Sequence, residues 1–277
     1  MLEALAAIVK ALLYAGLLSC AGAVFAEATL RTSADIAGVS THIVRRAAVL
    51  TIVTSVASAL ILILRLGGQW DEVTLSAVFM SASGAATCLQ LAGASLLLAS
   101  LGDSSAHGTR LSNAALMTLS FAFNGHAAAQ GLTEGSVAFV HASAAAWWIG
   151  SLWLLRYACT RPDLIVVAGV VERFSVIATN LIGGLVIAGL LLILILVDFA
   201  RLPSLLPYEK ILAIKMAIVV AALCAASYNR FRLTPRLVMG DSAAAFSLRR
   251  MIDVELVLIG LVLATTSILT TYTSPYE

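Results

Sequence analysis

Long, uninterrupted apolar runs dominate this sequence and set the strongest limit on its fold. Eight of them lie at roughly 4–26, 47–66, 73–101, 111–129, 135–158, 174–199, 208–229 and 251–272. Each run is long enough to cross a hydrocarbon core of about 30 Å as a helix that rises about 1.5 Å per residue. None shows the alternation of apolar and polar residues that a membrane β-barrel requires. We therefore expect an all-α integral membrane protein, a bundle of eight transmembrane helices.

The composition supports a membrane protein and argues against other partners. Only 12% of the residues are charged and the mean hydropathy is +1.00, whereas a soluble domain carries about 25% charged residues. The net charge of +2 is uninformative about partners, and the sequence has no basic patch interleaved with aromatic residues that would suggest nucleic acid. Gly and Pro interrupt the runs without forming a linker, so we expect one polytopic domain over residues 1–277. The expected partner is the lipid bilayer.

The distribution of Lys and Arg predicts how the bundle is oriented. Loops after odd-numbered helices hold twelve of these residues, loops after even-numbered helices hold three, and two lie inside helices. Because positive loops stay in the cytoplasm, both termini are expected on the periplasmic side. The first run has Glu3 before it and Lys10 within it, so we interpret it as a retained helix rather than a signal peptide. The loop 27–46 is expected to contain a short interfacial helix.

Two of the four histidines flank a short polar turn between the fourth and fifth runs. His126 lies about 22 Å along the fourth helix, and His141 about 9 Å below the start of the fifth. Both imidazoles are therefore expected at a similar depth near the outer face, on adjacent helices. Imidazole is the commonest protein ligand of transition metals, so the pair predicts a metal site. The alternative is two interfacial histidines, each bonded to a backbone carbonyl.

Other polar groups inside the runs are secondary candidates. Trp148 follows His141 by two turns on the same helical face, where it would either pack as an ordinary interfacial tryptophan or shield the metal. Lys215 and Glu255 are costly in a membrane unless they are paired or reach the surface. We expect Lys215 to reach outward and Glu255 to pair with Arg249 or Arg250, and the alternative is a transport or gating role.

Sulfur atoms are placed at regular depths along the predicted bundle. Cys20, Cys88 and Cys224 each lie about 15 residues into a helix that runs inward, and Met80 and Met216 share a shallower depth. Thiolates and thioethers suit Cu(I), so these layers could form a metal relay. The alternative is ordinary apolar packing. The cysteines show no C-x-x-C pattern that would suggest disulfides.

The remaining patterns indicate no catalytic chemistry. His42 and His107 fall in predicted cytoplasmic loops without a nearby ligand at metal spacing, so we expect them at the surface. The sequence contains no H-E-x-x-H motif, no glycine-rich phosphate loop and no defensible Ser-His-Asp order. The chain is therefore not expected to be an enzyme.

Several short motifs, in this order, resemble the copper resistance protein D family of bacterial inner-membrane proteins. They are Gly125-His126-Ala127, the H-x6-W-x-G pattern formed by His141, Trp148 and Gly150, Lys215 within L-A-I-K-M, Tyr228-Asn229-Arg230 followed by Pro235, and Arg249-Arg250 with Glu255. The likeness extends from about Phe121 to Pro275. It implies an eight-helix, multi-pass protein that takes copper from the periplasm toward the cytoplasm. It also implies a separate periplasmic copper-binding protein as a partner, and copper as the metal that His126 and His141 bind.

Two other functions remain open from the residues. Histidines on neighbouring helices can also be the axial ligands of haem, which would make the chain a membrane redox protein. The third possibility is a structural subunit without a bound cofactor.

Overall fold

The computed structural model describes residues 1–30, 33–103, 106–123, 132–196 and 207–272, and the regular structure in these ranges is helical throughout. The elements are α1 (Leu2–Leu30), α2 (Ala34–Arg65), α3 (Glu72–Phe79), α4 (Ala82–Ser100), α5 (His107–Leu119), η1 (Ser120–Phe123), α7 (Leu132–Ala158), α8 (Leu164–Leu196), α9 (Pro207–Tyr228), η3 (Asn229–Leu233), α10 (Thr234–Val238) and α11 (Ser242–Tyr272). The short elements differ in kind, because η1 is a 3-10 helix and η3 a π-helix. The predicted all-helical fold is confirmed.

Seven helical units in the described ranges are long and apolar enough to cross a membrane. They are α1, α2, α4, α7, α8, the continuous unit from α9 to α10, and α11. The predicted span 111–129 corresponds to α5 and η1 as far as Phe123, and its remaining residues lie outside the described part of the chain. The protein is therefore a multi-pass helical membrane protein, while the eighth crossing stays a prediction.

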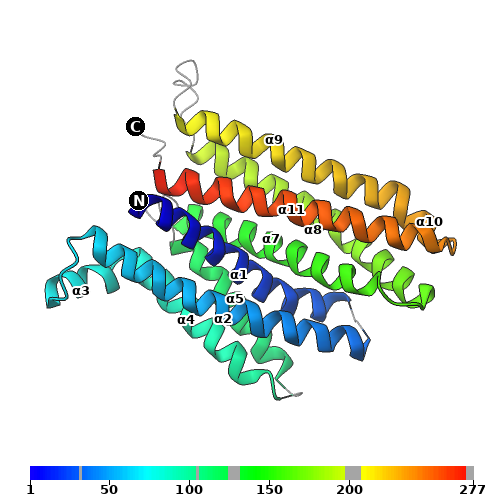
Figure 1. The fold of residues 1–277 in the computed structure, drawn as a ribbon, viewed down its shortest axis with the longest axis horizontal. Coiled ribbons are helices and arrows are strands. Elements are labelled where there is room, and N and C mark those ends of the chain that lie inside the picture. The colour runs from blue at the N-terminus through cyan, green and yellow to red at the C-terminus, as the bar shows by residue number, and fades with distance from the viewer. Residues whose placement is uncertain (31–32, 104–105, 124–131, 197–206, 273–277) are drawn as a thin grey trace.

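The helices form an elongated bundle with α1 near its centre (Figure 1). α1 packs against α2 and α7 and also contacts α5 and α11. On one side of α1 lie α2, α4 and α5, and on the other α8, α9 and α11 (Figure 1). The start of α1 and the end of α11 meet at one end of the bundle, where Lys10 Nζ donates hydrogen bonds to Thr270 O and Oγ1 at 3.2 and 3.3 Å.

Small residues allow the central helices to approach closely. Where α1 crosses α7, a Cβ at Gly150 would lie 2.1 Å from the carbonyl oxygen of Gly22, and a Cβ at Gly22 would lie 1.8 Å from that of Ala146. Glycine and alanine at such crossings are the usual means of helix association in membranes, where no hydrophobic effect drives helices together. Next to this crossing, Trp147 Nε1 donates a hydrogen bond of 2.8 Å to Thr29 Oγ1. The tight crossing keeps α7, which carries His141, against the middle of the bundle.

Two predicted boundaries are wrong. The run 73–101 is not one helix, because it divides into α3 and α4 at Met80 and Ser81. Ser81 caps α4 by accepting a 3.0 Å hydrogen bond from Gly84 N, which lets a new helix begin at an angle. The short interfacial helix expected within 27–46 is also absent from the described residues, since α2 begins at Ala34 and continues unbroken to Arg65.

The run 208–229 is longer than predicted. After Tyr228 the helix passes through the π-turn η3 and continues as α10 to Val238. Thr234 Oγ1 donates a 3.0 Å hydrogen bond to the carbonyl oxygen of Asn229, which also accepts the backbone N–H of Thr234. A π-turn inserts one extra residue into a helix and is frequent at functional sites. Asn229 is the first residue of this turn.

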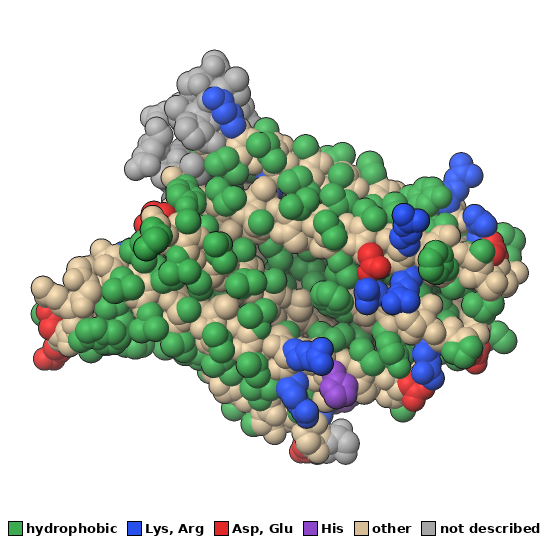
Figure 2. All heavy atoms as spheres, viewed as in Figure 1, with side chains coloured by type: hydrophobic (Ala, Val, Ile, Leu, Met, Phe, Trp, Pro, Cys, Tyr) green, Lys and Arg blue, Asp and Glu red, His purple; other side chains and the backbone are tan. Residues whose placement is uncertain are grey.

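Charged side chains gather near the ends of the bundle, whereas its flank is largely apolar. Figure 2 shows hydrophobic side chains along the visible flank and most of the Lys and Arg side chains toward the end that carries α10. Exposed large apolar residues include Ile187 and Leu194 on α8 and Val220 on α9. An exposed apolar flank of this kind fits contact with lipid rather than water.

Candidate metal site

His141 lies inside the bundle between α7 and α8. It is nine residues after Leu132, the first residue of α7, which places it about 14 Å along the helix. Its Nδ1 is 3.1 Å from the carbonyl oxygen of Leu185 on α8. A carbonyl oxygen can only accept, so Nδ1 carries the proton in this contact. The Nε2 lone pair is thereby left for a ligand, an arrangement common in metal-binding histidines.

Gly189 makes room for the imidazole. A Cβ at Gly189 would lie 3.1 Å from Cε1 and 3.5 Å from Nδ1 of His141. Gly189 follows Leu185 by four residues, so its backbone N–H and the imidazole share one carbonyl acceptor on one turn of α8. The glycine therefore permits the ring to lie against the α8 backbone.

Lys215 on α9 is a charged residue close enough for its charge to act on His141. It is eight residues after Pro207, about 12 Å along α9, and its charge acts on His141. The side chain is partly buried. Lys215 was expected near the outer end of its helix. In the structure, this position places it in the surroundings of His141. An ammonium group at this position would repel a cation bound to Nε2.

The second predicted ligand cannot be placed. His126 lies in 124–131, outside the described residues, so the predicted pairing of His126 with His141 stays a prediction. Within the described ranges, no three His, Cys, Asp or Glu side chains gather closely enough to hold a metal ion. A metal at His141 would therefore need further ligands from beyond those ranges, and His126 is the predicted one.

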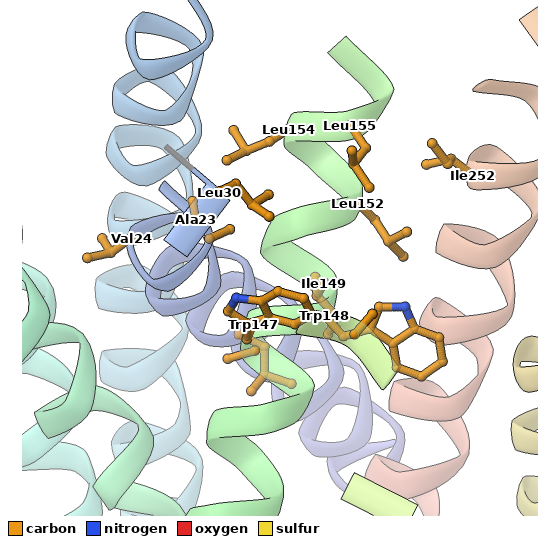
Figure 3. Close-up of a cluster of buried hydrophobic side chains, with 14 of the residues drawn as sticks. Ala23, Val24, Leu30, Trp147, Trp148, Ile149, Leu152, Leu154, Leu155 and Ile252 are labelled. Carbon is orange, nitrogen blue, oxygen red and sulfur yellow. The ribbon is translucent and has the colours of Figure 1, made fainter. Parts of the chain in front are cut away.

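Trp148 points away from α1 and toward α11. Figure 3 shows Trp147 and Trp148 leaving α7 on opposite sides, Trp147 toward α1 and Trp148 toward α11. Trp148 is buried, and its indole lies near the carboxyl group of Glu255. This contact is two turns along α7 from His141. Two roles were predicted for Trp148, packing and shielding of the metal. The shielding role stays a prediction.

Glu255 has a different partner from the one predicted. Asn229 Nδ2 donates a hydrogen bond to Glu255 Oε1, and no contact with Arg249 or Arg250 is present among the described residues. The expected pairing was wrong because α11 begins at Ser242, so Glu255 is 13 residues inside the helix and faces the bundle. Sequence reasoning also missed Asn229 as its partner. The sequence feature that could have pointed to Asn229 is its position as a polar residue at the end of an apolar run.

The sulfur atoms lie in different environments. Cys20 is buried, and its Sγ is 3.7 Å from the carbonyl oxygen of Val44 on α2. Cys88 and Cys224 are exposed. Met80 is exposed at the break between α3 and α4, and Met216 is partly buried. The three cysteines do not form a ligand cluster, and the relay stays a prediction.

The other two histidines are at the surface. His42 and His107 are both exposed, as predicted. His107 borders a shallow pocket between α1, α2 and α5, together with Glu27 and Arg110. Arg110 donates hydrogen bonds to the carbonyl oxygens at the end of α4, including Ser100 O at 3.1 Å. This pocket is at the opposite end of the bundle from the start of α7.

Comparison with known proteins identifies one family. Residues 168–269 match the family model of copper resistance protein D. The matched range runs from α8 to α11, so it includes Lys215, Asn229 and Glu255, whereas His141 and Trp148 precede it. No curated protein and no solved structure matches the chain.

Proposed function

We propose that the chain belongs to the copper resistance protein D family, whose model matches residues 168–269, and that it binds copper and moves it across the membrane. The family supports a membrane protein connected with copper resistance. The finer proposal is that copper enters from the periplasmic side through a site formed by His126 and His141. Copper is the cargo of this site, and no catalytic step is proposed.

The observation that carries this proposal is the orientation of His141. Its Nδ1–H points at the Leu185 carbonyl oxygen, and this fixes both the tautomer and the ring plane. An interfacial histidine bonded to a backbone carbonyl would make the same contact, so the copper content of the His141 variants decides between the two. Neutral imidazole nitrogen is a good ligand for copper ions, and the missing side chain at Gly189 leaves room for the ring against α8.

The location of the site supports cargo rather than structural metal. Three helices bring His141, Leu185 and Lys215 to similar depths, about 12–16 Å from the ends that carry the start of α7, the end of α8 and the start of α9. A structural metal site is usually closed by four protein ligands. A pair of histidines would leave other coordination positions of the copper ion without a protein ligand, which suits a cation that must be released again. We propose a separate periplasmic copper-binding protein as donor and the inner membrane as location.

Metal analysis of the purified protein tests the proposal. Wild-type protein is expected to retain copper after desalting, and His141→Ala should lower the copper content at least about tenfold, the effect of losing about 1.4 kcal/mol of binding free energy. The double variant His126→Ala/His141→Ala should lose it entirely. His42→Ala and His107→Ala are matched controls, because both remove an exposed imidazole. A double variant that keeps wild-type copper content would remove the proposed site.

The same preparation separates the alternatives. A Soret absorption band that scales with protein and disappears in His141→Ala would show haem ligation instead of copper transport. A structural subunit would show neither metal nor haem, and both histidine variants would match wild type in a copper-tolerance assay.

A further inference from the structure

Three polar side chains from three elements meet inside the bundle, away from His141. Trp148 on α7, Asn229 in η3 and Glu255 on α11 are 6%, 7% and 2% exposed. Asn229 Nδ2 donates a hydrogen bond to Glu255 Oε1, and the Trp148 indole lies next to the same carboxyl group. The cluster therefore surrounds one buried carboxyl group.

Two polar atoms of this cluster lack a hydrogen-bond partner. Trp148 Nε1 is a donor that lies near the Glu255 carboxyl group without good hydrogen-bond geometry, and Asn229 Oδ1 is an unused acceptor. Buried polar atoms are nearly always paired, so an open donor and an open acceptor at one site need an explanation. Another buried network shows the contrast, since Ser55 donates to Gln90 at 3.0 Å and Gln90 to Ser120 at 3.4 Å. That second network links helices and leaves no such gap.

No cation balances the Glu255 carboxyl group among the described residues. The basic side chains on the elements that pack against α11 have other neighbours or are exposed: Lys10 bonds Thr270, Arg156 pairs with Asp253, Arg173 bonds Leu30, Lys210 is exposed, Lys215 acts on His141, Arg230 bonds Ser175, Arg232 is exposed, and Arg236 pairs with Asp241. On α11 itself, Arg249 and Arg250 precede Glu255 by about one and a half turns and make no contact with it. The carboxyl group therefore relies on Asn229 and Trp148 alone.

The open donor and the open acceptor match the two protonation states of a carboxyl group. A carboxylate accepts only, and it can use both the Asn229 amide N–H and the Trp148 indole N–H. A carboxylic acid must donate one hydrogen bond, and it finds an acceptor in Asn229 Oδ1 once the amide turns over. One arrangement of side chains can thus hold Glu255 with or without a proton. A residue that only filled space would not need both options.

We propose that Glu255 is a proton-binding site that exchanges its proton against the copper ion. This inference rests on the proposed function. The proton moves from water at the arginine-rich end onto a carboxylate oxygen, and it returns to water when the cation reaches the bundle. Trp148 follows His141 by seven residues on α7, about 10 Å, so a cation at His141 and a proton at Glu255 repel each other. By reciprocity, copper binding weakens proton binding by the same factor.

Infrared spectroscopy of the purified full-length protein tests the proton site. Wild type should show a protonated-carboxyl band that shifts in D₂O and titrates with pH. Glu255→Gln should lack this band, while Glu172→Gln, which changes an exposed Glu on α8, should keep it. Asn229→Ala retains the carboxyl group but removes its amide partner, so the band should shift in frequency. A band that is unchanged in both Glu255→Gln and Asn229→Ala overturns the proposal.

Addition of the copper ion alone to weakly buffered protein tests the exchange. The wild type should release protons, detected with an indicator dye, and lose at least half of the Glu255 band. At a copper concentration that saturates both proteins, Glu255→Gln should release fewer protons, and it should bind copper more weakly because its neutral amide resembles the protonated carboxyl group. Equal release by wild type and Glu255→Gln overturns the exchange. The pH titration of the band needs no copper, so its result tests the proton site independently of the copper site.

Discussion

At Gly189, the nearest atom of His141 lies 3.1 Å from the position of an added Cβ, which is tighter than ordinary contact. Gly189→Val places a branched side chain there and should push the imidazole off the Leu185 carbonyl oxygen. We expect copper content to fall as far as in His141→Ala, with the folded yield preserved. Gly184→Val is the matched control, since a Cβ at Gly184 meets nothing within 4 Å. Equal copper content in the two variants would contradict the positioning role of Gly189.

Lys215 should weaken copper binding at His141 by charge repulsion. Replacing its ammonium by an apolar group of similar length, as in Lys215→Met, removes a repulsion of about 1.4 kcal/mol and should tighten copper binding about tenfold. Lys210→Met is the control, because Lys210 is exposed on the same helix. Competition with a chelator of known affinity measures the effect. Weaker binding in Lys215→Met would mean that Lys215 helps to hold the cargo.

At the scale of single residues, the chemistry of the site was predictable but its partners were not. His141 and Glu255 stand out in the sequence because polar groups are rare in apolar runs. Leu185 and Gly189 give no such signal, since the first acts through its backbone and the second through a missing side chain. Asn229, the partner of Glu255, is the first residue of a π-turn, and a π-turn has no clear sequence pattern.

The crossing of α1 and α7 should be the contact between elements that is least tolerant of change. A Cβ at Gly150 would overlap the backbone of Gly22 at 1.9 Å, so Gly150→Ala forces the two helices apart. Overpacking costs about 1–3 kcal/mol, and we expect a lower midpoint of thermal aggregation in detergent. Gly169→Ala, on α8 with open space around it, should match wild type. A stable Gly150→Ala protein would mean that this crossing is looser than described.

Among the elements, apolar runs predicted the order of the helices better than their ends. A run stays apolar through a helix break when a small cap residue such as Ser81 is enough to start the next helix. An apolar run also gives no signal for helical residues outside it, such as those of α2 from Ala34 and those of α10 to Val238. Helix ends depend on caps and on contacts with other segments, and hydropathy measures neither.

For the whole molecule, the two chain ends provide the sharpest test of the topology. Lys10 near the start of α1 bonds Thr270 near the end of α11, and Glu3 pairs with Arg65 at the same end of the bundle. Because chain ends on one face require an even number of crossings, we predict that the segment of α5 and η1 adds an eighth crossing to the seven long spans found in the described residues.

Reporter fusions check this expectation together with the orientation predicted from Lys and Arg. Alkaline phosphatase fused after residue 277 should be active in the periplasm, whereas green fluorescent protein at the same point should stay dark. Fusions within the turn between α7 and α8, at Pro162, should give the reverse result. A fluorescent C-terminal fusion with a dark fusion at Pro162 would invert the bundle and place His141 near the cytoplasm. Two fusions on the same side would mean that the crossings between them are miscounted. In either case copper could not reach His141 from the periplasm by the proposed route.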